Sequence, residues 1–167
     1  RMAGKSGLDV QAGRPISVFL NGDYWGLYNL REKVNENYIS SNHSDIDPDR
    51  INLLMNDKQV VQGSNADYLA MEAFVSSNSL SVNSNYEYIK TKIDIDNYIN
   101  YNVAQIYYGN TDWPGNNTKF WKFDTEYSKW RWILYDTDFG LGIYGNSSHN
   151  TLTFAVDPNG PGWPNPP

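Results

Sequence analysis

The chain of 167 residues contains no cysteine and no run of 18 apolar residues. The first absence excludes disulfides, thiolate-bound metals and cysteine nucleophiles. The second indicates that no part of the sequence crosses a membrane as a helix. Neither absence fixes the cellular compartment, which stays open, with export to a cell surface as one alternative.

Histidine and positive charge are also scarce. The two histidines, His43 and His149, lie in Asn/Ser-rich segments and lack the ligand spacing of a zinc site. Lys and Arg number 13 against 19 Asp and Glu, which gives a net charge of −6. Because proteins that bind nucleic acid neutralise its phosphates with a basic face, we expect no nucleic-acid partner.

The length suits one domain with a real core and is short for a two-lobed enzyme. We expect a single domain over residues 1–167, with incomplete lobes and a loop-rich tail over residues 143–167, where Gly, Asn, Ser and Pro predominate. Residues 1–14 predict neither a signal peptide nor a strand, so we interpret the chain as a piece of a longer protein.

A β-hairpin is predicted near the N-terminus. Apolar residues alternate over residues 16–20, and Asn21-Gly22 favours the positive φ angles of a tight turn. The returning strand, over residues 25–33, places Arg31 and Lys33 on one face. Either of them could bind phosphate groups. Glu32 faces the other way, and we expect it to pair with a basic group inside the fold.

Short helices and strands follow in an order that predicts an α+β fold with a small sheet, central helices and a second hairpin. We expect helices over residues 35–41, 67–78 and 86–93, and strands over residues 50–55 and 58–61. A longer helix begins at Asp94 or Asp96 and ends before Gly109. Its apolar spacing predicts a buried stripe of Ile95, Ile99, Val103, Ile106 and Tyr107.

The polar side chains with the clearest chemistry lie at the two ends of the second hairpin, whose strands are predicted over residues 118–124 and 130–136. Asp112 and Asn117 precede it, and Asp136 and Asp138 end it, with Phe-Gly directly after Asp138. Protein kinases use the same D-x₄-N spacing, followed about twenty residues later by D-F-G, to orient a hydroxyl and to hold Mg²⁺ against nucleotide phosphates. Unlike those kinases, the chain has no His-Arg before Asp112.

Asp136 and Asp138 share one face of an extended strand end, so both carboxylates are expected to approach one cation. Oxygen ligands of this kind suit Mg²⁺, Mn²⁺ or Ca²⁺. A calcium-stabilised loop without catalysis is the alternative for this pair. For Asp112 the alternative is a turn-capping role before Pro114-Gly115.

Three separated segments resemble the CotH kinase-like family, which is named after spore coat protein H: VFLNGDYWGLYNLREKVNENYI at residues 18–39, GNTDWPGNNTKFW at 109–121 and WRWILYDTDFG at 130–140. The resemblance covers most of the chain. It implies an atypical protein-kinase-like fold that uses ATP and a divalent metal to phosphorylate Ser or Thr of secreted or coat proteins. Asp112 then corresponds to the catalytic carboxylate, Asn117 to the metal-binding amide, and Asp136 or Asp138 to the metal-binding aspartate.

The chain departs from this pattern because no G-x-G-x-x-G precedes the first predicted strand. Either that loop lies upstream of residue 1 or nucleotide binding is weakened. A degenerate kinase and a non-catalytic surface module with a structural cation therefore stay open as alternatives, as does the oligomeric state. In such a module the hairpin tryptophans could stack on sugars, although alternating aromatics more often build a core. These residues are Trp113, Trp121, Trp130 and Trp132.

Overall fold

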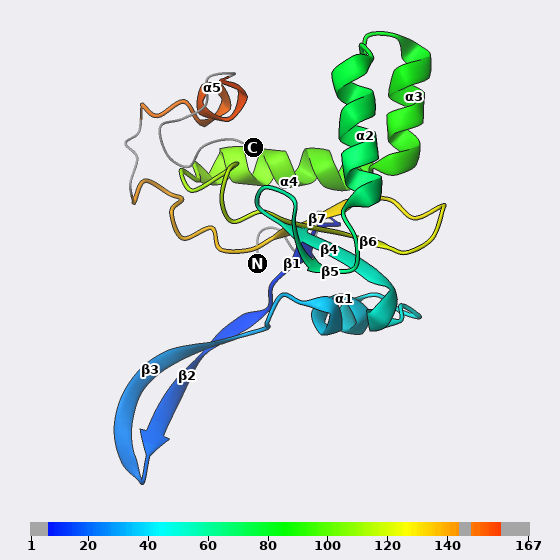
Figure 1. Ribbon diagram of the computed structural model, residues 1–167. Coiled ribbons are helices and arrows are strands. Elements are labelled where there is room, and N and C mark those ends of the chain that lie inside the picture. Colours follow the sequence, from blue (N-terminus) through cyan, green and yellow to red (C-terminus); the bar gives the residue numbers. More distant parts are fainter. Residues whose placement is uncertain (1–6, 144–147, 158–167) are drawn as a thin grey trace.

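The structure is a computed structural model that describes residues 7–143 and 148–157 (Figure 1). Helices and strands mix without regular alternation, which confirms the predicted α+β class. No helix within the described residues is both long enough and apolar enough to cross a membrane. In chain order the elements are β1 (Asp9–Val10), β2 (Gly13–Leu20), β3 (Asp23–Arg31), α1 (Glu36–Asn42), the 3₁₀ turn η2 (Pro48–Arg50), β4 (Ile51–Met55), β5 (Gln59–Gln62), α2 (Ala66–Ser77), α3 (Asn83–Lys92), α4 (Ile95–Tyr108), β6 (Lys119–Phe123), β7 (Arg131–Leu134) and α5 (Thr151–Val156).

β2 and β3 form the predicted N-terminal hairpin, which extends away from the rest of the molecule as an arm (Figure 1). Asn21 and Gly22 turn the chain with φ angles of 51° and 94°, the left-handed values that these residue types tolerate. The pairing register shifts next to Trp25, which bulges out of the second strand. Residues 13–31 are called the arm below.

A five-stranded sheet forms the centre of the molecule, with the strand order β1-β7-β6-β4-β5. The predicted second hairpin is confirmed as β6 and β7, in which Phe120 lies opposite Trp132. β1, which the sequence did not predict, pairs in parallel with β7. The sheet therefore joins the start of the chain to the hairpin that carries the candidate site.

Side chains of the central strands alternate between two apolar clusters, one on each face of the sheet. On β7, Trp132 belongs to the cluster beneath α2, α3 and α4, whereas Ile133 belongs to the cluster that packs on α1. The hairpin tryptophans are buried in these clusters, which excludes a sugar-stacking platform built from Trp113, Trp121, Trp130 and Trp132.

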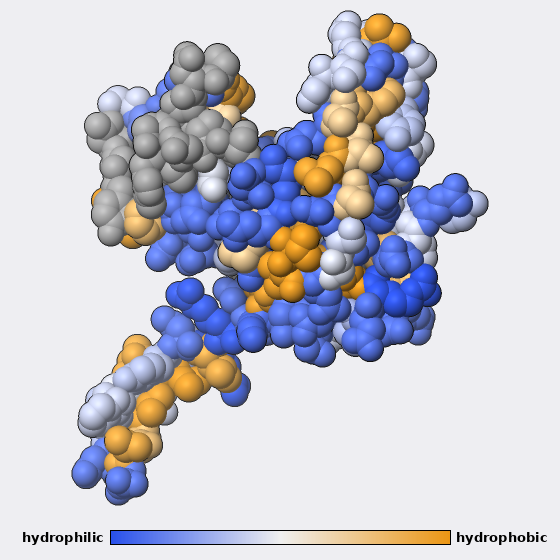
Figure 2. All heavy atoms as spheres, viewed as in Figure 1, coloured by the Kyte–Doolittle hydropathy of each residue, from blue (hydrophilic) through white to orange (hydrophobic). Residues whose placement is uncertain are grey.

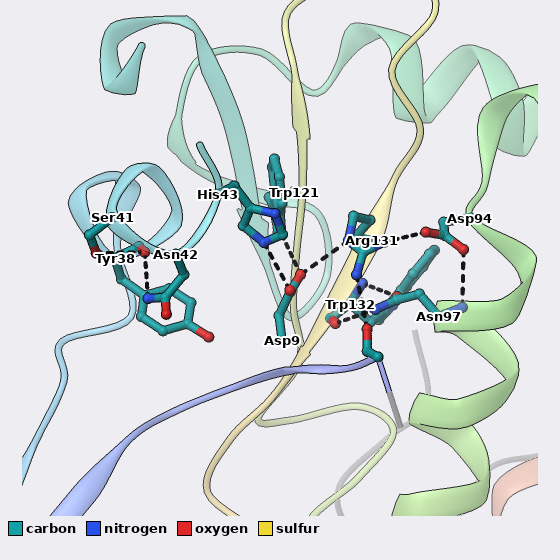
Figure 3. A network of polar contacts seen from close by, with 11 residues as sticks. Asp9, Tyr38, Ser41, Asn42, His43, Asp94, Asn97, Trp121, Arg131 and Trp132 are labelled. Carbon is teal, nitrogen blue, oxygen red and sulfur yellow. Dashed lines mark hydrogen bonds and ion pairs between the residues drawn. The ribbon is translucent and has the colours of Figure 1, made fainter. Parts of the chain in front are cut away.

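A partly buried polar network fastens β1 to its neighbours (Figure 3). One carboxylate oxygen of Asp9 lies 2.9 Å from Nε2 of His43, and the other accepts hydrogen bonds from Nε1 of Trp121 and Nε of Arg131, at 3.0 and 3.2 Å. Arg131 also pairs with Asp94, the N-cap of α4. Burial raises the pKa of Asp9, but the hydrogen bonds and the charge of Arg131 outweigh it and hold the pKa below its usual value.

The predicted apolar stripe of α4 is wrong at three of its five residues, whereas Ile106 packs against the core and Ile95 is partly buried. Ile99, Val103 and Tyr107 are 52 %, 58 % and 73 % exposed, and the fully buried face carries Asn97 and Gln105 together with Tyr101. Asn97 explains the rotation: its Oδ1 accepts from the backbone N–H of Trp132 at 2.7 Å, and its Nδ2 donates to the carbonyl of Trp132 at 3.2 Å. The helix thus presents Asn97 to the sheet because this side chain satisfies buried strand backbone.

The tail expected to be loop contains a short helix, α5, between residues 151 and 156. Asn150 begins it by accepting a hydrogen bond from the backbone N–H of Thr153 at 3.0 Å. Residues 144–147 and 158–167 of the expected tail lie outside the described residues.

Candidate active site

The end of α4 sets the position of Asp112. Gly109 ends the helix in the left-handed conformation, with φ of 62°, and the fully buried Asn110 follows. Nδ2 of Asn110 donates to Oε1 of Gln105 at 2.8 Å, and its Oδ1 accepts from the backbone N–H of Asp112 at 3.0 Å. Gln105 in turn donates to the hydroxyl of Tyr101 at 3.1 Å. A buried chain of side chains therefore connects the core of α4 to Asp112.

The carboxylate of Asp112 is 5 % exposed and is held by two amides. Nδ2 of Asn116 donates to both carboxylate oxygens, at 3.0 and 3.2 Å, and Nδ2 of Asn117 donates to Oδ2. Asn116 is fixed by Asn56 of the β4–β5 turn, whose Nδ2 donates to its Oδ1 at 3.3 Å. Asn117 has a positive φ of 52°, a conformation that asparagine tolerates better than most residues. The predicted pair of Asp112 and Asn117 is thus in direct contact.

The loop after β7, residues 135–141, brings the second pair of aspartates toward the end of α4 and is called the aspartate loop below. β7 stops at Leu134, and Asp136 has a φ of 51°, so the expectation of an extended strand end carrying Asp136 and Asp138 is wrong. The loop is fixed to α4 by the backbone N–H of Leu141, which donates to the carbonyl of Tyr108 at 2.6 Å. A Cβ on Gly140 would lie 2.8 Å from that same carbonyl, so the glycine permits the close approach.

The neighbouring carboxylate charges raise the pKa of Asp136. The pKa of Asp136 is raised by burial first and then by the charge of Asp138, with a smaller contribution from Asp112, while Arg31 acts in the opposite direction. Burial, Asp136 and Asp112 together raise the pKa of the Tyr135 phenol to about 12. Asp112, Asp136 and Asp138 therefore share one negative electrostatic environment, which a cation would relieve.

A cavity of about 490 Å³ opens between the base of the arm and the aspartate loop. Arg31 and Asn29 line it from β3, and Asp136, Thr137 and Asp138 line it from the other side. Nη1 of Arg31 lies 3.9 Å from Oδ1 of Asp136, across the cavity.

Lys33 lies beyond the end of β3 and is not part of this lining. Burial lowers the pKa of Lys119, and the nearby charge of Lys33 lowers it further. Of the two basic residues predicted to bind phosphate, the structure therefore brings only Arg31 to the aspartate loop. Asp112 and Asn117 lie outside the lining as well, next to the loop rather than on the cavity wall.

Glu32 takes a different partner from the basic group expected. Its Oε2 accepts a hydrogen bond from the backbone N–H of Ala12 at 2.7 Å, and its own backbone N–H donates to the Ala12 carbonyl at 3.0 Å. Glu32 thereby closes the base of the arm, directly beside Arg31.

The side chains around the cavity fit Mg²⁺ or Mn²⁺ better than Ca²⁺. Within the part of the chain that the structure describes, no three His, Asp or Glu side chains converge on a ready-made metal cage. Mg²⁺ and Mn²⁺ sites that act on nucleotides use few protein ligands, because phosphate oxygens and water complete the octahedron. The neighbouring carboxylates of Asp136 and Asp138 match that pattern better than the ligand-rich cage typical of Ca²⁺.

The family model described as CotH kinase protein matches residues 1–166. The chain belongs to the CotH kinase family. A search of curated proteins finds no match to the chain. The family match confirms the resemblance carried by the three sequence segments, and it establishes a kinase-like domain at the level of the family.

Several side chains of the candidate site in this CotH kinase family member were not predicted from the sequence. Asn110, Gln105, Asn116 and Asn56 make no recognisable motif, because each acts through a neighbour that only the fold supplies. The one available signal was the run Gly-Asn directly after a predicted helix, where asparagine commonly bonds the local backbone.

Proposed function

We propose that this domain transfers the γ-phosphoryl group of ATP to a Ser or Thr hydroxyl of a protein, with Mg²⁺ or Mn²⁺ bound at Asp136 and Asp138. The proposal rests on one observation above others: the aspartates of the D-x-D-F-G loop face Arg31 across a cavity, and Asp112 shares their electrostatic environment. Kinase chemistry needs few covalent steps from the protein, so positioning and charge stabilisation account for most of the catalysis.

Arg31 is the candidate for the phosphates, because a guanidinium can donate two parallel hydrogen bonds to phosphate oxygens. Asp136 and Asp138 would hold the cation, which when bound neutralises charge on the transferred group. The Nδ2 of Asn117 donates to Asp112. Its amide oxygen would therefore be available as a further ligand for the cation. Asp112 would orient the acceptor hydroxyl and take its proton at a carboxylate oxygen.

A second candidate is a degenerate kinase that binds nucleotide without transferring phosphate. The burial of Asp112 favours it, because an acceptor hydroxyl would have to reach a residue that is 5 % exposed and whose carboxylate oxygens already accept hydrogen bonds from Asn116 and Asn117. The two candidates differ in turnover alone.

Incubation with radiolabelled ATP, Mn²⁺ or Mg²⁺ and a Ser/Thr peptide library distinguishes them. We expect label on peptide with the wild-type chain and at least a hundredfold less with Asp112→Asn, at nearly unchanged ATP affinity. Asp124→Asn, which replaces an exposed aspartate directly after β6, is the matched control and should retain full transfer. ATP binding without transfer by the wild type would leave the degenerate kinase, and loss of binding in Asp112→Asn would contradict the assigned role.

A further inference from the structure

Apolar side chains meet solvent in this molecule in two different ways. Figure 2 shows that they gather along the arm, where they lie open to solvent. Elsewhere they line a hollow: a cavity of about 150 Å³ lies between α2, α4, the β4–β5 turn and the sheet. Six aromatic rings form most of its walls, and it is called the aromatic pocket below. The rings belong to Tyr68, Tyr98, Tyr101, Trp113, Phe120 and Trp132.

The size of the aromatic pocket suits a single ring. Sites for cofactors and other drug-sized ligands measure about 300–1,000 Å³, whereas an apolar cavity of about 150 Å³ holds a benzene-sized molecule. Its floor is well packed, because Tyr101, Phe120 and Trp132 are each at most 6 % exposed. Tyr98 is 41 % exposed and packs against Trp132, with 4.6 Å between the ring centroids. A further ring that enters here meets the edges and faces that aromatic rings prefer as partners.

Charge narrows the occupant to a neutral group. Of the described residues that line the aromatic pocket, only Lys58 and Glu72 are charged, and Nζ of Lys58 lies 3.1 Å from Oε1 of Glu72. Aromatic walls by themselves would also attract a quaternary ammonium group. Here the ammonium of Lys58 already pairs with the carboxylate that such a ligand would need, and it repels a second cation. A neutral aromatic ring therefore fits the pocket better than a charged group.

The aromatic pocket shares a wall with the candidate active site. Trp113, which lines the pocket, directly follows Asp112 in the chain. Asn56 also lines the pocket, and it donates to Oδ1 of Asn116, which in turn donates to the carboxylate of Asp112. Each residue of an extended peptide spans roughly 3.4 Å. A ring in the pocket and a hydroxyl at Asp112 can therefore belong to nearby residues of one bound peptide.

We propose that the aromatic pocket selects the protein substrate by binding a Phe, Tyr or Trp side chain close in sequence to the acceptor Ser or Thr. This inference rests on the proposed kinase function, because it takes the acceptor hydroxyl to lie at Asp112. Burial of one aromatic side chain supplies enough apolar contact for at least a tenfold preference over alanine at that position. Tyr98 and Asn102, which border the pocket from α4, then determine specificity.

Binding of a free ring tests the pocket without any need for catalysis. Saturation-transfer-difference NMR of the full chain with N-acetylphenylalanine amide should show binding with a dissociation constant on the order of 1 mM, and N-acetylalanine amide should show none. Tyr98→Ala removes one wall, and Asn102→Trp places an indole at the pocket, so each should weaken binding at least fivefold. Tyr86→Ala is the matched control and should change binding less than twofold, because Tyr86 is 39 % exposed on α3 and outside the lining.

Circular dichroism and thermal unfolding establish which variants fold, and Asn102→Trp keeps the test decisive if Tyr98→Ala does not. Tetramethylammonium should leave the bound ring in place. Absence of ring binding to the wild type overturns the proposal. Equal binding by Asn102→Trp and the wild type also overturns it, as does displacement of the ring by tetramethylammonium.

Phosphorylation of peptides tests the role in substrate selection. In a Ser peptide that carries Phe in turn at each of the three positions before and after the acceptor, one position should raise kcat/KM at least tenfold over Ala. Asn102→Trp should reduce this preference below twofold, whereas Tyr86→Ala should keep it. Peptide phosphorylation without an aromatic preference overturns this inference and leaves the proposed function standing. Absence of transfer to every peptide overturns both together.

Discussion

Replacing Asn110 with alanine tests whether the buried chain of side chains at the end of α4 holds Asp112 in place. Asn110 is fully buried, and its side chain accepts from the N–H of Asp112 and donates to Oε1 of Gln105. The alanine leaves both of these groups without a partner, away from water. Each buried polar group left unpaired costs about 1–3 kcal/mol, so we expect the variant to lose roughly 2–5 kcal/mol of its free energy of unfolding.

Urea denaturation followed by tryptophan fluorescence measures this loss. Asn102→Ala provides the control on the same helix, because the side chain of Asn102 donates to the Tyr98 carbonyl in a solvent-exposed hydrogen bond. An exposed substitution of this kind should change the free energy of unfolding by about 0.5 kcal/mol or less. If Asn110→Ala also costs less than about 1 kcal/mol, the hydrogen bonds of Asn110 do not hold the loop, and the argument for a pre-positioned Asp112 is refuted.

Three further substitutions test the surroundings of the site. The pKa of Asp9 lies below 3.8 in the folded protein, so the stability that its charge contributes is fully present above that value and is lost as the pH falls below it. Asp9→Asn should therefore flatten the acid limb of the urea midpoint plotted against pH, and an unchanged limb contradicts the network around Asp9. Gly140→Ala forces a Cβ within 2.8 Å of the Tyr108 carbonyl. It should lower the free energy of unfolding by about 1–3 kcal/mol in the same denaturation assay. An unchanged free energy of unfolding would mean that the aspartate loop is not packed against α4. The pKa of Asp136 is raised, so its charge is unfavourable in the folded state. Asp136→Asn should therefore raise the melting temperature at neutral pH without added cation. A fall in melting temperature would contradict this electrostatic environment.

Local sequence signals predicted most of the elements. The arm followed from alternating residues and Asn21-Gly22, and β6 and β7 followed from their aromatic alternation. The buried face of α4 did not follow, because apolar periodicity cannot show that Asn97 satisfies the backbone of Trp132. Whether a helix buries its apolar or its polar side depends on what the neighbouring sheet leaves unpaired.

Of the candidate site, too, the sequence predicted one part and missed another. The spacing of Asp112, Asn117, Asp136 and Asp138 predicted one region of carboxylates and an amide. In the structure Asn117 contacts Asp112, and the charges of Asp138 and Asp112 help to raise the pKa of Asp136. Alternation along the strand could not decide between Arg31 and Lys33, because β3 ends at Arg31 and only Arg31 lines the cavity. The supporting asparagines around Asp112 depend on long-range contacts, which no spacing rule contains.

Thermal unfolding of the chain with ATP and Mg²⁺ or Mn²⁺ tests the central claim most directly, beside Asp136→Asn and Asp138→Asn. At a hundred times its dissociation constant, a ligand that binds only the folded state adds about 2.7 kcal/mol. For a domain of this size that raises the melting temperature by roughly 5–10 °C. We expect this rise for the wild type only when metal and ATP are both present, and we expect it to be lost in the aspartate variants. A rise with cation alone and none with nucleotide would contradict the kinase proposal and support a structural cation site.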